Sequence, residues 1–64
     1  MKYRLRKKVD ELRRQADETL LVLVKAAKIY REEGKEAEAT QCEKAAEFIQ
    51  RLDNDLFMAS IALS

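Results

Sequence analysis

Apolar residues recur along the chain at alternating spacings of three and four positions. The first series is Leu5, Val9, Leu12, Ala16, Thr19, Leu23, Ala26 and Tyr30, and the second is Cys42, Ala45, Ile49, Leu52, Leu56, Ala59 and Leu63. Such a repeat is typical of α-helices that pack nearly parallel in a left-handed supercoil. The pattern therefore predicts two long amphipathic helices, and the alanines within both series allow these helices to approach closely.

A single break separates the two series at Gly34, the only glycine in the chain. Glycine adopts the left-handed backbone conformation that follows many helix ends without steric cost. Glu36 and Glu38 then fall in the first turn of the next helix, where carboxylates complement the helix dipole. The chain has no proline and is rich in strong helix formers, which favours helix on both sides of the break.

These signals predict an all-α fold, an antiparallel helical hairpin in one domain that spans residues 1–64. We expect the first helix at about 3–33, a turn at 34–35 and the second helix at about 36–63. Because the turn is so short, the two helices are expected to be antiparallel neighbours.

A second break in the later helix is the alternative at Asp53, Asn54 and Asp55, because these residues are able to cap a new helix. The apolar repeat passes through them without a change of phase. A continuous helix is therefore the preferred interpretation.

Two stretches carry more apolar side chains than one hairpin contact can bury. Residues 20–30 are apolar around most of the helix, with Lys25 and Lys28 on one narrow face, and residues 56–63 contain only Ser60 as a polar residue. A helix that is apolar on nearly all sides must be buried on nearly all sides. We therefore predict an oligomer interface at Leu20, Val22, Leu23, Val24, Ala27, Ile29, Tyr30, Ile49, Leu56, Phe57, Met58, Ile61 and Leu63.

The predicted partner is a second copy of the chain. If about six large side chains stayed exposed in a monomer, about 10 kcal/mol of burial would be lost, which is comparable to the whole stability of a small domain. A homodimer that forms a four-helix bundle is favoured, and a closed ring of hairpins is the next possibility. The open alternative is a fragment of a longer protein whose remainder covers this surface, since residues 61–63 end the chain on an apolar run.

The composition offers little for catalysis. The chain has no histidine and one cysteine, Cys42, which lies in the second apolar series and is interpreted as a core residue. The lone cysteine excludes an internal disulfide and disfavours a zinc site. No enzyme activity, catalytic residue, cofactor, metal or small-molecule substrate is predicted.

The charge is unevenly distributed, because residues 1–14 carry +5 and the rest of the chain −4, for a net charge of +1. The basic segment 2–8 is able to contact phosphates, but Leu5 continues the apolar series there, so a solvated face is preferred and nucleic acid is disfavoured. No run approaches the ~20 apolar residues of a membrane span, and no signal peptide is recognised. We expect a cytoplasmic location, natural or in a recombinant host, and no secretion.

One partial resemblance covers residues 20–51. The positions Ala27, Tyr30, Gly34, Ala39 and Ala46 are similar to the small, aromatic and glycine positions of a tetratricopeptide repeat, and the stretch also resembles microtubule-interacting-and-transport domains. The chain departs from the repeat at Glu36, where an aromatic residue is usual, and at Lys28, where peptide-binding repeats carry asparagine. The resemblance implies the alternative function, a peptide-binding or adaptor module truncated from a longer chain.

The whole chain resembles de novo designed helical bundles. The Glu-Glu-Gly-Lys-Glu-Ala-Glu-Ala turn, the Ala-, Glu-, Lys- and Arg-rich surface and the absence of Pro, His and Trp carry this resemblance. It implies that assembly itself is the function. The leading hypothesis is a self-assembling structural protein without biochemical activity.

Overall fold

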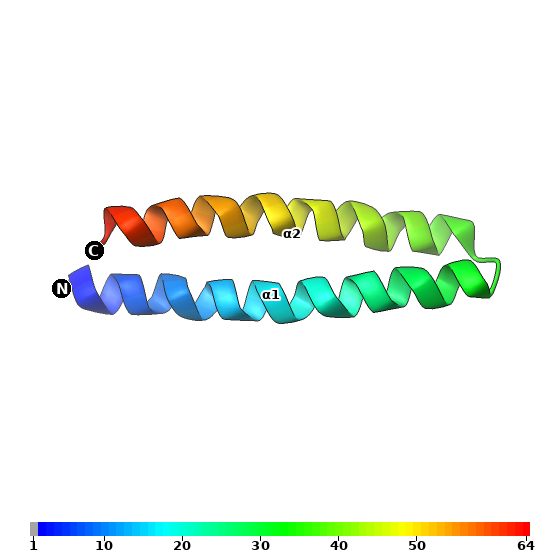
Figure 1. Ribbon diagram of the computed structural model, residues 1–64, viewed down its shortest axis with the longest axis horizontal. Coiled ribbons are helices and arrows are strands. Elements are labelled where there is room, and N and C mark those ends of the chain that lie inside the picture. Colours follow the sequence, from blue (N-terminus) through cyan, green and yellow to red (C-terminus); the bar gives the residue numbers. More distant parts are fainter. Residues whose placement is uncertain (1) are drawn as a thin grey trace.

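The computed structural model describes residues 2–64, which form two helices, α1 (Lys2–Glu32) and α2 (Glu36–Ala62), lying antiparallel side by side (Figure 1). The described chain measures 49 × 14 × 10 Å, so it is a rod two helices wide and one helix deep. Its radius of gyration is 14.7 Å, against about 11 Å for a compact domain of this length. The predicted all-α hairpin is confirmed, and α2 runs without a break through Asp53 and Asp55.

The turn is built around Gly34, whose φ is +76°. The amide of Lys35 donates to the carbonyl of Tyr30 at 2.8 Å, and the amide of Gly34 donates to the carbonyl of Arg31 at 3.1 Å. These two bonds form a Schellman motif, which satisfies carbonyl groups that the end of α1 would otherwise leave free. The first turn of α2 then contains Glu36 and Glu38, as the dipole argument predicts.

The interior of the hairpin consists of small side chains. The buried residues in the described chain are Ala16, Ala27, Ala39, Ala46 and Ser60, and no larger side chain is fully buried. The accessible surface is 5214 Å², whereas a typical folded monomer of this mass exposes about 4,200 Å². The two helices therefore approach closely but enclose no hydrophobic core, and about 1,000 Å² remains in excess of the usual surface.

The line along which the helices touch, called here the contact line, differs from the predicted apolar series. On α1 it follows Val9, Arg13, Ala16, Leu20, Leu23, Ala27 and Tyr30, and on α2 it follows Ala39, Cys42, Ala46, Ile49, Asp53, Leu56, Ser60 and Leu63, all buried or half-buried. Leu5, Leu12 and Thr19 of the first series are instead exposed. Four of the eight residues of the first series and four of the seven of the second lie on the contact line, and the others lie one column of side chains to one side of it.

Both displacements lead to the same side of the hairpin. Neighbouring columns in a repeat of 3.5 residues are about 50° apart around the helix axis. When each helix is viewed from its own N-terminus, the displaced column lies in the same direction of rotation from the contact line in both helices. Because α1 and α2 are antiparallel, equal rotations turn both stripes toward one common face. The apolar series therefore point about 50° away from the contact line, out of the plane of the hairpin.

Replacement of Gly34 by L-alanine is expected to destabilise the fold by about 1 kcal/mol, because nothing blocks the added Cβ but the backbone is left-handed there. D-Alanine, which favours this conformation, is expected to preserve or increase stability. Urea unfolding of the synthetic chains at one fixed concentration measures both. Glu33→Ala, next to the glycine, is the control and should change stability by less than about 0.5 kcal/mol. Equal stabilities for the two alanine enantiomers would contradict this account of the turn.

Candidate functional site

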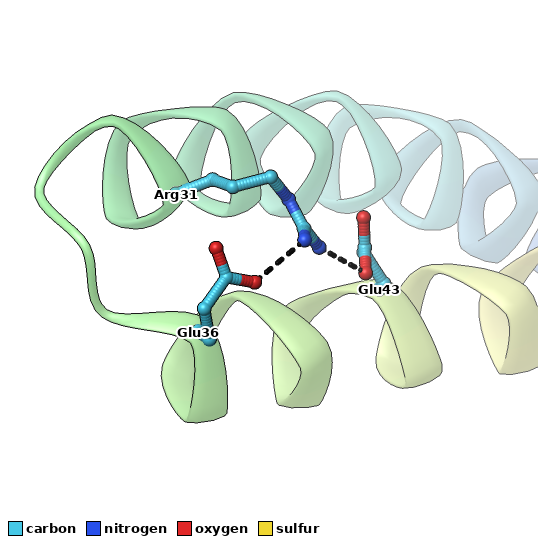
Figure 2. A network of polar contacts seen from close by, with 3 residues as sticks. All are labelled: Arg31, Glu36 and Glu43. Carbon is cyan, nitrogen blue, oxygen red and sulfur yellow. Dashed lines mark hydrogen bonds and ion pairs between the residues drawn. The ribbon is translucent and has the colours of Figure 1, made fainter.

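The hairpin has two unlike broad faces, and the first, called here the polar face, holds every polar contact between the helices of the described chain. Near the turn, Arg31 of α1 reaches over α2 and bonds Glu36 at 2.7 Å and also pairs with Glu43 (Figure 2). Farther along, Arg13 Nε lies 3.4 Å from Asp53 Oδ1. These pairs fix the two helices relative to each other from one side only.

The open end of the polar face continues the same arrangement. Ser60 Oγ donates a 2.7 Å hydrogen bond to Asp10 Oδ1, which satisfies the hydroxyl of the one buried polar residue described. The guanidinium of Arg13 lies 4.9 Å from the ring centre of Phe57, a cation–π contact. A shallow hollow beside it is lined by both apolar and charged groups, including Ile61 and Arg6. Phe57 and Ile61 are thus surrounded by charges rather than by other apolar side chains.

The opposite face, called here the apolar face, is where the two apolar series meet. Its residues are Leu5, Val9, Leu12, Thr19, Val22, Leu23, Ala26, Ile29 and Tyr30 of α1 and Cys42, Ala45, Phe48, Ile49, Leu52, Leu56, Ala59 and Leu63 of α2. No ion pair or side-chain hydrogen bond between the described helices crosses it. The face runs almost the full length of the hairpin, and the polar residues in the columns of Val22 and Phe48 are Lys8, Gln15, Gln41 and Asp55.

Large side chains on the apolar face lie in solvent. Val22 is 64% exposed, Phe48 63% and Ile29 54%, and Leu5 and Leu12 are also exposed. Folded monomers rarely leave contiguous apolar surface on this scale, and where it occurs it commonly marks a binding surface. The arrangement can do no evident chemistry, but it offers a long flat surface against which another apolar surface can pack.

The structure places the thirteen predicted interface residues in four groups. The apolar face gathers Val22, Leu23, Ile29, Tyr30, Ile49, Leu56 and Leu63. The polar face holds Val24, Phe57 and Ile61, beside the charged groups of Arg31 and Glu43 or of Arg6 and Arg14, and Met58 points away from α1. Leu20 and Ala27 lie on the polar side of the contact line, where Ala27 is buried by the hairpin itself. Their roles in an interface stay predictions.

Ten residues of the apolar face are absent from the predicted interface, and three of these, Leu5, Leu12 and Phe48, are large and exposed. Leu5 and Leu12 belong to the first apolar series but lie outside the two stretches with an excess of apolar residues, 20–30 and 56–63. Phe48 stands alone between Glu47 and Ile49, outside the second series. Its signal was its spacing of three from Ala45 and four from Leu52, which makes a second stripe beside the first.

Other kinds of site find no support in residues 2–64. The described residues contain no cluster of three or more side chains suited to a metal ion. Cys42 is a free, half-buried thiol on the contact line. Neither α1 nor α2 combines the length and apolar character that a membrane crossing requires. No protein-family model, curated protein or solved structure matches this chain.

The Arg13–Asp53 pair is expected to specify geometry more than to supply stability. Its side chains are only 30% and 28% exposed, so Asp53→Leu leaves a guanidinium poorly solvated and should cost about 1 to 2 kcal/mol. The double variant Arg13→Leu/Asp53→Leu should be at least as stable as the natural pair, because two well-packed leucines need no desolvation of charge. Urea unfolding measures both, and a double variant less stable than Asp53→Leu alone would contradict this interpretation.

Proposed function

We propose that this protein is a self-associating helical hairpin whose function is assembly, and that two copies pack through their apolar faces into a four-helix bundle. One observation carries the proposal. The apolar series of both helices point to a common open face instead of toward each other. The molecule therefore presents its best core-forming residues to a partner.

The direction of the apolar series fits a bundle of four helices. In such a bundle each helix contacts two neighbours about 90° apart, so the side chains that fill the centre point about 45° from either neighbour. In the hairpin the series of both helices are turned about 50° from the contact line. A two-stranded coiled coil would instead place each series directly on the contact line.

The surface area is also sufficient. A specific dimer of standard size buries about 800 Å² on each partner. The hairpin exposes about 1,000 Å² more than a typical folded monomer of its mass. Burying the apolar face against a second copy would remove an excess of this size. The Ala-, Glu- and Lys-rich outer surface further supports a designed assembly as the origin of the chain.

The competing proposal is an adaptor or peptide-binding module, in which a foreign amphipathic helix occupies the apolar face. The observation in its favour is the same exposed face, together with the partial tetratricopeptide resemblance of residues 20–51. The two proposals differ in what the purified chain does alone. Assembly predicts a dimer, whereas the adaptor predicts a monomer that binds an added ligand.

Sedimentation equilibrium at micromolar concentration is therefore expected to give about twice the chain mass of 7.4 kDa. The dissociation constant sets the reference for the variants below. A cooperatively folded species of 7.4 kDa at these concentrations would exclude the proposal.

Two adjacent residues provide a matched test of the face. Val22 and Leu21 are 64% and 65% exposed in the hairpin, but only Val22 lies on the apolar face. Val22→Lys is expected to weaken the dimer about 100-fold, because it removes an apolar contact and buries a charge. Leu21→Lys adds the same charge at a position off the apolar face, and its dissociation constant should stay within about threefold of that of the unmodified chain.

The mass of each variant at several concentrations measures both dissociation constants, and circular dichroism reports whether the helices are retained. Equal weakening by the two lysines would show that the interface is not the apolar face. Weakening by Leu21→Lys alone would move the interface to the outer side of α1.

A further inference from the structure

The two ends of the hairpin differ in charge. The half that contains the turn, residues 18–49, has seven carboxylates and five cations, whereas the other half has eight cations and five carboxylates. Charge therefore changes sign along a molecule 49 Å long. Two copies that pack with their turns at the same end would bring like charges together at both ends. Two copies with turns at opposite ends would bring unlike charges together.

Several cations at the open end lack carboxylate partners within the hairpin. Among the described residues, Lys2, Arg4, Lys7 and Lys8 at the open end have no carboxylate within ion-pair distance. The cations also lie at the N-terminus of α1, where they oppose the helix dipole, and the first turn of α1 contains no acidic residue. A partner's acidic turn beside this end would compensate both effects.

A more specific pattern lies on the rim of the apolar face. A heptad column on α1 borders the stripe formed by Leu5, Leu12 and Val22, and its members are Arg4, Glu11, Glu18, Lys25 and Glu32. This column flanks the stripe. At flanking positions of this kind, charges of one helix meet charges of its partner and set the relative orientation of the two helices. All five residues are exposed in the hairpin.

The order of charges along this column is complementary to the same order read in the opposite direction. When α1 is laid antiparallel on a second α1 about its midpoint near residue 18, Arg4 meets Glu32 of the other copy and Glu11 meets Lys25. The two-fold axis makes each of these pairs twice. The like-charge contact is Glu18 with itself, and in the hairpin this carboxylate is paired with Arg14 at 3.4 Å. Laid antiparallel on α2 of a second copy, the same column would place Lys25 near Lys44 and Glu18 near Arg51, so one of its two charged contacts would be repulsive.

We propose that two copies associate about a two-fold axis perpendicular to the helices, with α1 antiparallel on α1, the turns at opposite ends, and ion pairs Arg4–Glu32 and Glu11–Lys25 between copies. This inference rests on the proposed self-association and adds the orientation of the partner. The partner is a second copy because the charge pattern of α1 complements itself. Binding of a foreign ligand does not require such self-complementarity. All neighbouring helices in this bundle are antiparallel.

A charge-exchange cycle within one chain tests the pairing. Glu11→Lys and Lys25→Glu each turn two attractive contacts into repulsive ones and should weaken the dimer about tenfold. The double variant restores the pair with its signs exchanged and should bind within about threefold of the unmodified chain. Residues 11 and 25 lie about 21 Å apart along one helix, so coupling between them arises only across the interface.

Lys28→Glu is the matched control, because it makes the same charge change as Lys25→Glu outside the rim column. It should change the dissociation constant by less than about threefold and should not be rescued by Glu11→Lys. Dissociation constants come from sedimentation at low salt. For the unmodified chain, 0.5 M salt should weaken the dimer severalfold, whereas a dimer with turns at the same end would be strengthened by screening.

A distance measurement tests the orientation without altering the pairs. Nitroxide labels at residue 35 in Lys35→Cys/Cys42→Ala lie at the turn, so turns at opposite ends should give a separation of about 50 Å, close to the 49 Å length of the hairpin. Turns at the same end should give less than about 20 Å. Labels at residue 54, near the middle of α2, should give about 30 Å or less in either arrangement and confirm that labelled dimers are present.

The outcomes separate this inference from the proposed function. A dimer with coupled residues 11 and 25 and the long distance supports both. A dimer with additive variants or the short distance overturns the orientation and leaves self-association standing. A monomeric chain overturns both proposals.

Discussion

A pair of helices can bury only the stripes that face each other, and this limit governs the rest of the structure. Each helix here carries apolar residues over a wider arc than its neighbour can cover. The hairpin resolves the conflict by placing small residues, Ala16, Ala27, Ala39 and Ala46, at the closest contacts. The helices thereby come close together, but the large apolar side chains are left beside the contact line. The result is a rod without a core and with one apolar face.

The polar contacts reinforce this division. Every described ion pair and hydrogen bond between the helices lies on the face opposite the apolar one, including the pairs of Arg13 with Asp53 and of Arg31 with Glu43. Polar groups at these positions make the second face a poor surface for packing, since burying them would require desolvation of charge. The hairpin is thus two-sided, and the apolar face is the side on which the proposed partner would pack. Assembly through a single face closes into a defined particle and does not extend without limit.

The sequence and the structure agree most closely where local chemistry decides. Gly34 ends α1 because only glycine adopts φ +76° without cost, and the helix bounds follow within a residue or two of the prediction. The continuity of α2 through Asp53 likewise follows from an uninterrupted repeat. For the candidate site, Val22, Ile29 and Ile49 were expected in an interface and lie on the apolar face. Phe57 and Val24 were expected with them but lie among charges, because an excess of apolar residues identifies a helix segment without giving the side it turns toward.

The sequence by itself determined that this chain is two helices with a turn at Gly34 and that their apolar series exceed what one hairpin can bury. Those properties depend on the helix propensity of the residues and on the spacing of apolar residues along the chain, both of which can be read from the sequence. Only the tertiary structure decided which columns touch, because the first series contains Leu12 whereas the structure has Arg13 at the contact line. The close packing of alanines selected Arg13, and Asp53 across from it removed the cost of placing a cation there. That choice turned Leu5, Leu12 and Phe48 outward together and formed the face on which the proposed assembly rests.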